Sequence, residues 1–241
     1  MSRSIVIVIL VIILIAIPIL MRKLSWKKMI NALNDVDYNR YYDIIDSFSC
    51  KMTFSAFDRE NMRLSGFIAQ NRKDDVENQI KMMMNMRIKP KQKVALGTRG
   101  FYYYLEQGKA KRARDMIDFA KANGPESSYK DLELQYSILL KKESKYIDEV
   151  KAKIDAIWNG KDHLDGDKKV VVGTFQYLIG LQYSYKNDLE NMKLYFEQAL
   201  ENVAGTPYEE NIKNILKKNI YKKGWISAFL LVNAFCVICR G

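Results

Sequence analysis

The chain has little proline, glycine, cysteine and histidine. Among its 241 residues are four prolines, twelve glycines, three cysteines and one histidine. Because turns and strand breaks draw heavily on proline and glycine, this scarcity favours long helices over an all-β fold. No segment rich in proline, serine or glycine divides the chain. Three cysteines do not make a disulfide framework, and they fit a reducing compartment.

The sequence also lacks the residue patterns of a catalytic or metal site. His163 lies among three aspartates in residues 160–167, but the spacing does not match an EF-hand and no closing glutamate follows. Cys236 and Cys239 form an isolated CxxC pair, without two further zinc ligands or the βαβ context of a redox site. There is no phosphate-binding loop, nucleophile elbow or paired acid–base motif. We therefore expect no enzymatic activity, no cofactor and no metal.

Charged side chains are absent from one long apolar run, residues 5–21, which also has no amide or hydroxyl side chain. As a helix it would be about 25 Å long, near the lower limit for crossing a hydrocarbon core. A buried helix of a soluble protein would carry a polar stripe, and a cleaved signal peptide would end in small residues. This run ends at Arg22 and Lys23 instead. The sequence therefore predicts a retained transmembrane anchor over residues 1–23.

Basic residues flank the run mainly on one side. Arg3 alone precedes it, and four basic residues follow closely: Arg22, Lys23, Lys27 and Lys28. Because the more basic flank stays cytoplasmic, we expect the main domain on the cytoplasmic side of the cell membrane. The net charge of +11 suits an anionic membrane surface or a nucleic acid, and the anchor favours the membrane. An amino-acid composition rich in lysine, isoleucine and asparagine is typical of a bacterial protein.

After the anchor, the apolar pattern takes on helical spacing. Trp26, Met29, Ile30 and Leu33 are spaced i, i+3, i+4 and i+7, which places them on one face of a helix. We therefore expect the anchor helix to continue without a break into the domain that follows.

Further predicted helices alternate with short turns, in pairs. Asp37 is the candidate N-terminal cap of the first, and Thr53 or Ser55 that of the second, whose apolar face Asn61 interrupts. The predicted helices cover residues 38–48, 55–71, 74–84, 90–105, 110–122, 129–142, 144–157, 170–185, 188–203 and 207–219. Such an array of helical hairpins must stack neighbours to bury its apolar faces.

Small and aromatic residues recur at fixed positions in these pairs. One unit contains Tyr104, Gly108, Ala113, Ile117, Ala120 and Pro125; a second contains Gly180, Tyr183, Phe196 and Ala199; a third keeps Gly66, Met82 and Pro90. These units resemble the tetratricopeptide repeat (TPR), whose period is about 34 residues. The chain departs from that family at Gly97, Phe101 and Met192, where the family prefers Trp, Gly and Ala.

The resemblance implies a fold and a kind of function for residues 24–219. The fold is an all-α, TPR-like αα-hairpin solenoid that follows an N-terminal transmembrane helix, with an irregular helical bundle as the alternative. The resemblance also implies a scaffold or adaptor that binds a protein or peptide partner, here at the cytoplasmic membrane surface. The sequence identifies neither that partner nor the oligomeric state.

A membrane-tethered module that binds nucleic acid is the alternative function. The basic residues 109–114 lie close in sequence to three tyrosines at 102–104, and such a combination can bind RNA by charge and stacking. The basic residues and the tyrosines belong to different helices of one pair, on either side of Gly108. We therefore favour the scaffold and a lipid bilayer as a partner over nucleic acid.

The C-terminal residues 220–241 form a hydrophobic tail. Residues 225–239 contain no charged side chain, and lysines precede them. The run is short for a membrane span. It fits a second span, an interfacial helix or a helix that covers the last repeat, so the protein is expected to be single-pass or two-pass.

Overall fold

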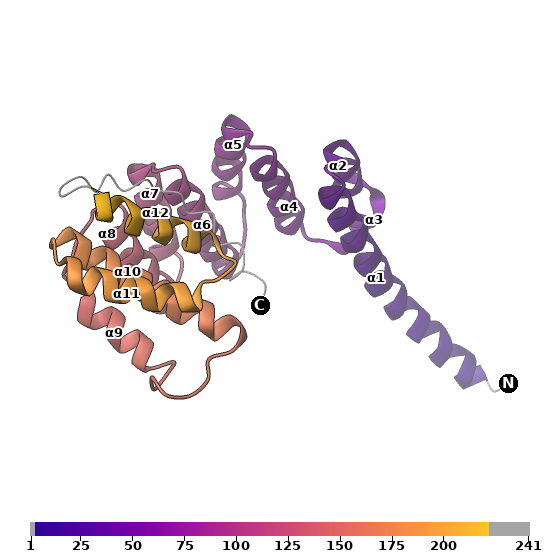
Figure 1. The fold of residues 1–241 in the computed structure, drawn as a ribbon. Coiled ribbons are helices and arrows are strands. Elements are labelled where there is room, and N and C mark those ends of the chain that lie inside the picture. Colours follow the sequence, from indigo (N-terminus) through magenta and orange to yellow (C-terminus); the bar gives the residue numbers. More distant parts are fainter. Residues whose placement is uncertain (1–2, 222–241) are drawn as a thin grey trace. The chain divides into compact units, whose positions relative to one another are not determined.

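The computed structural model describes residues 3–221, together with the side chains of residues 14–206 and 208–217. Within this part of the chain the secondary structure is α-helical, with one short 3-10 turn and no strand. The predicted all-α class is thereby confirmed. The chain divides into two compact units, residues 1–96 and 97–241, and each is described on its own (Figure 1).

Five helices lie within the first unit, and a sixth begins in it and ends in the second. Their bounds are α1 (Arg3–Asn34), α2 (Tyr38–Asp46), α3 (Phe48–Thr53), α4 (Ala56–Ala69), α5 (Lys73–Met84) and α6 (Pro90–Glu106). Helix α1 packs against both α2 and α3, and α4 packs against α2 and α5. The core at these contacts is formed by Met29, Ala32, Tyr41, Ile45, Cys50, Phe54 and Met62.

Helix α1 is uninterrupted from the apolar run into the core of the first unit (Figure 1). It passes through Pro18 and ends at Asn34, so the expected continuity of the helix is confirmed. On the predicted face, Met29 is buried and Leu33 packs against the core, but Trp26 is 50% exposed. The buried face also includes Ser25 and Ala32. The buried face is centred on small residues that let α2 and α3 approach, and the larger Trp26 lies at its edge.

Among the residues that the structure describes, we find no helix with both the length and the apolar character needed to cross a membrane. The side chains of residues 1–13 and the whole predicted tail segment 225–239 lie outside the described residues.

Serine and aspartate caps fix several helix starts in the first unit. Asp37 accepts the backbone N–H of Arg40, as predicted for the start of α2. Ser47 caps α3 by accepting the N–H of Cys50, so the helix predicted over residues 38–48 is two helices with a break at Ser47. Phe48, the last residue of that predicted helix, is consequently 73% exposed, whereas Cys50 is fully buried.

The second unit is organised around its longest helix. It contains α7 (Ala110–Lys121), the 3-10 turn η1 (Glu126–Ser128), α8 (Lys130–Leu139), α9 (Ile147–Asp155), α10 (Gly166–Tyr185), α11 (Leu189–Asn202) and α12 (Pro207–Tyr221). Helix α10 contacts α8, α9, α11 and α12, and it is buried over most of its length from residue 172 onward. Such burial on several sides matches its nearly continuous apolar sequence.

Two helices of the second unit start elsewhere than predicted. Helix α9 begins at Ile147, three residues after the predicted start at residue 144. The backbone N–H of Tyr146 donates to Oε1 of the buried Gln182 on α10, at 2.8 Å. Helix α10 begins at Gly166, one turn before the predicted start. The start of α9 thus involves a contact with a residue 36 positions further along the chain, which local apolar spacing does not reveal.

Candidate functional site

The residues predicted to pack the TPR-like units fall in both compact units. In the second unit, Tyr104, Ala113 and Ala120 are buried. A Cβ atom at Gly97 would lie 2.9 Å from Cβ of Ala120. The helix that contains Gly97 thus approaches α7 closely at the position where the TPR family prefers a tryptophan.

Two further predicted positions of that unit lie at its turns. Gly108 has φ = 65°, a left-handed conformation that glycine adopts without strain, at the turn between α6 and α7. Pro125 precedes η1 in an extended conformation. Gly108 therefore lies in the turn that follows α6, whereas Pro125 lies four residues beyond the end of α7 and precedes the 3-10 turn.

Helices α10 and α11 form another closely packed pair. A Cβ atom at Gly180 would lie 2.5 Å from Cδ1 of Phe196, which is fully buried, as is Ala199. Tyr183 stacks on Tyr195 across the pair, with ring centroids 5.6 Å apart. The two helices can approach this closely because residue 180 has no side chain.

Gly66 allows a similar approach in the first unit. A Cβ atom there would lie 2.8 Å from the hydroxyl oxygen of Tyr42 and 2.9 Å from Cε1 of Tyr41. Helix α4 therefore lies directly on two tyrosines of α2.

Ionisable groups in the second unit mainly serve packing. Burial raises the pKa of Tyr177 and of Tyr208 above the ordinary value of 10.0. Burial also raises the pKa of Tyr185 to about 12. These phenols stay protonated near neutral pH, and the rings of Tyr177 and Tyr208 pack together with centroids 5.2 Å apart. Within the described part of the chain, no cluster of three or more His, Cys, Asp or Glu residues is placed to hold a metal ion.

Arg114, in the basic stretch 109–114, is engaged with acidic side chains. Arg114 lies 3.0 Å from Asp118 and 3.6 Å from Glu133. The neighbouring Tyr103 and Tyr104 are buried. These two tyrosine rings therefore have little surface left for stacking on bases.

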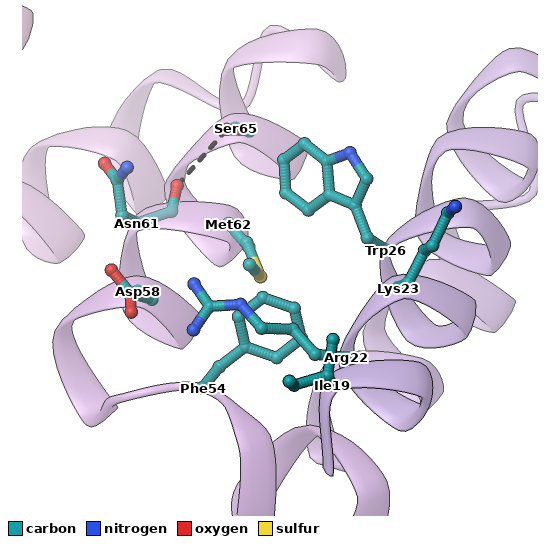
Figure 2. A pocket seen from close by; sticks show the side chains of 9 residues that line it. All are labelled: Ile19, Arg22, Lys23, Trp26, Phe54, Asp58, Asn61, Met62 and Ser65. Atoms are coloured by element: carbon teal, nitrogen blue, oxygen red, sulfur yellow. Dashed lines mark hydrogen bonds between the residues drawn. The ribbon is translucent and has the colours of Figure 1, made fainter. Parts of the chain in front are cut away.

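A cavity of about 580 Å³ lies in the first unit, between α1 and α4 (Figure 2). Helix α1 contributes Ile19, Arg22, Lys23 and Trp26, which are spaced i, i+3, i+4 and i+7 and therefore share one face. Helix α4 contributes Asp58, Asn61, Met62 and Ser65, with the same spacing. Phe54 closes one end of the cavity from the segment between α3 and α4.

Arg22 is held over an aromatic ring inside this cavity. Its guanidinium carbon lies 4.7 Å from the ring centroid of Phe54, and Nη1 donates to the carbonyl oxygen of Thr53 at 3.4 Å. Figure 2 shows the guanidinium directed toward α4, with Lys23 at the edge of the cavity beside Trp26. Among the described residues, neither Arg22 nor Lys23 has a carboxylate within 4.0 Å. The cavity thus carries basic charge that no neighbouring acid neutralises at contact distance.

The acidic member of the cavity is part of a helix cap. The N–H of Asp58 donates to Oγ of Ser55 at 3.1 Å, and the N–H of Ser55 donates to Oδ2 of Asp58 at 3.4 Å. This reciprocal capping box fixes the start of α4 and the position of Asp58. Ser65 donates to the carbonyl oxygen of Asn61. The wall formed by α4 is therefore polar at Asp58, Asn61 and Ser65, beside the thioether of Met62.

The structure separates the predicted basic flank into two pairs. Arg22 and Lys23 line the cavity, while Lys27 and Lys28 are exposed outside it. Sequence reasoning did not find Phe54 or the residues of α4 as part of a site. One signal was present: the polar Asn61, which interrupts the apolar face of its helix, lies in the wall of the cavity.

The described residues define an all-α protein with a basic and aromatic cavity beside the end of an apolar helical run. In comparisons with known proteins, no family model, no curated protein and no solved structure matches this chain.

Proposed function

We propose that the protein is a membrane-anchored helical scaffold or adaptor that binds partner proteins at the cytoplasmic surface of the membrane. The observation that carries this proposal is the exposed apolar part of α1. Leu14, Ile15 and Ile19 are 69%, 61% and 65% exposed. In water, exposed apolar surface costs about 25 cal/mol per Å² relative to burial, so a row of such residues indicates a partner that covers them.

A lipid bilayer is the partner that suits this part of α1. The apolar run continues to residue 5 in the sequence, and Arg22 and Lys23 follow it directly. Because α1 is one helix, the anchor and the core residue Met29 belong to the same rigid element. The domain would therefore be held at a fixed height above the membrane, with the basic flank on the cytoplasmic side.

Helical hairpins with glycine at the crossing points support the scaffold role. The close approach of Gly180 to Phe196 occurs at positions where the TPR family places a small and a large residue, and a second close approach joins Gly97 of α6 to Ala120 of α7. In that family, stacked hairpins bind peptides or proteins. The engagement of Arg114 by two acids favours this role over nucleic-acid binding.

Reporter fusions in the host membrane test location and topology. A reporter fused after residue 30 is expected to lie in the cytoplasm. A reporter fused at residue 241 decides whether the C-terminal tail crosses the membrane. Recovery of the full chain in the membrane fraction after alkaline wash is the accompanying measurement. A chain released by that wash, or a first reporter outside the cytoplasm, contradicts the proposal.

Crosslinking tests the scaffold role. The full chain and a variant that lacks residues 24–219 are crosslinked in membranes and purified in detergent. We expect at least one protein that is captured only by the full chain. Absence of such a protein, or capture of RNA in its place, contradicts the adaptor role without affecting the anchor.

A further inference from the structure

The cavity between α1 and α4 lies where a membrane-anchored protein would meet the headgroup layer. One wall begins at Ile19, inside the apolar run, and continues through Arg22 and Lys23 to Trp26. At about 1.5 Å of rise per residue, Ile19 and Trp26 are about 10 Å apart along the axis, which is comparable to the thickness of one headgroup layer. The cavity therefore spans the change from apolar to polar surroundings.

We propose that this cavity binds the phosphodiester and the first acyl-chain segment of one membrane phospholipid. The inference rests on the membrane location proposed above. It goes beyond general attraction between a basic flank and an anionic leaflet, because it assigns one lipid to a defined cavity.

Arg22 is the group suited to the phosphodiester. Its guanidinium presents five N–H donors, and the hydrogen bond to Thr53 uses Nη1 at a long 3.4 Å. The ring of Phe54 supports the guanidinium from one side at 4.7 Å, which leaves its edge to form paired hydrogen bonds with phosphate oxygens. Lys23 adds a second positive charge at the rim (Figure 2).

The remaining walls match the other parts of a phospholipid. Ile19, Phe54 and Met62 supply apolar contact for the first methylene groups of an acyl chain. Trp26, which is half exposed, is of the type that gathers at membrane interfaces. Asp58 places one carboxylate on the wall opposite the basic residues, which favours a headgroup with a single phosphodiester over one with additional phosphates.

The test compares two charge-matched variants of the full chain. R22Q/K23Q removes the two cations of the cavity, and K27Q/K28Q removes two exposed cations from the same helix, so both variants lose the same charge. Glutamine has nearly the helix propensity of lysine and arginine, so α1 is retained in both. Each protein is purified in mild detergent, and bound phospholipid is counted by native mass spectrometry. Binding of dioctanoyl phosphatidylglycerol is titrated by the fluorescence of Trp26, in a W158F/W225F background that removes the other two tryptophans.

We expect one retained phospholipid for the parent chain and for K27Q/K28Q. For R22Q/K23Q we expect an affinity lower by about tenfold or more, the usual effect of losing hydrogen bonds to a charged group. Equal loss in the two variants would reduce the effect to general electrostatic attraction and overturn the proposal. Displacement of the lipid by glycerol 3-phosphate at equal concentration would assign the cavity to a soluble phosphate ester and would also overturn it.

The two proposals fail separately. The titration uses a short-chain lipid in solution, so it reports on the cavity even if the alkaline wash shows that the chain is not an integral membrane protein. Conversely, a chain that stays in the membrane but retains no lipid loses only the cavity assignment.

Discussion

Replacing Gly180 with alanine tests how closely α10 and α11 approach each other. A Cβ atom at this position would lie 2.5 Å from Cδ1 and 2.6 Å from Cε1 of Phe196, well inside van der Waals contact. The ring of Phe196 is fully buried and packs on Tyr177, with centroids 5.8 Å apart. It therefore cannot retreat from the new methyl group without displacing a second aromatic ring.

Two opposing effects set the size of the change. Alanine is favoured over glycine inside a helix by about 1 kcal/mol. Overpacking of a filled core costs about 1–3 kcal/mol, and the double contact with a fully buried ring places this site at the upper end. We expect G180A to lower the free energy of unfolding by about 2 kcal/mol.

Urea unfolding of the full chain in detergent, followed by circular dichroism, measures this change. The control is F196L, which alone costs less than the roughly 3–5 kcal/mol of a buried Phe→Ala change. In the double variant the methyl group enters the space that the ring leaves, so the two losses should fall short of additivity by about 1 kcal/mol or more. A G180A protein that is more stable than the parent by the full helix-propensity gain would show that the helices do not touch at this position.

Two further perturbations address the helix caps. S55A removes the hydroxyl that accepts the N–H of Asp58, and it should lower the free energy of unfolding in urea by about 1 kcal/mol. S65A on the same helix should lower it clearly less. Equal losses in the two variants would argue against the capping box. Hydrogen bonds from Asn191 hold the pKa of the Asp188 carboxyl below its ordinary 3.8. The ionised cap therefore stabilises the folded state above about pH 3.8, and this stabilisation is lost as the pH falls through the lower pKa of the folded state. Thermal unfolding should therefore show the parent more stable than D188A at neutral pH, with the gap closing below pH 3.8, and a gap that is constant with pH would refute the assignment.

Local sequence features predicted the existence of most helices, because caps and apolar spacing act over a few residues. Asp37 and Ser55 both cap the helices that the sequence assigns to them. Pro90 and Pro207 each begin a helix, where the missing N–H of proline has no cost. Such signals need no knowledge of the rest of the chain.

The break at Ser47 was not predicted, because the apolar spacing continues across it. Tyr41, Ile45 and Phe48 suit one helical face, yet the chain turns at Ser47 and buries Cys50 in place of Phe48. The turn lets α3 pack on α1, where Ser49 and Ser25 share a hydrogen bond at 2.9 Å. Tertiary contacts of this kind decide between two local conformations that the sequence permits.

The cavity could not be predicted from spacing alone. Its two walls come from α1 and α4, and nothing in either segment states that they face each other. The sequence assigned Arg22 and Lys23 to a membrane flank together with Lys27 and Lys28, and the structure distinguishes the pairs by their place on the helix. Whether a residue lines this cavity depends on packing between two segments about 40 residues apart in the sequence.

Because α1 is one continuous helix, the number of residues between the apolar run and the core fixes how the two are rotated relative to each other about the helix axis. One residue inserted after Lys23 would turn Ile19 and Arg22 by about 100° around the axis relative to Met29. The same insertion in a flexible tether would change nothing but reach. Insertions and deletions between Arg22 and Met29 would rotate the whole first unit about α1 with respect to whatever surrounds Leu14 and Ile15, an effect that no single substitution there has.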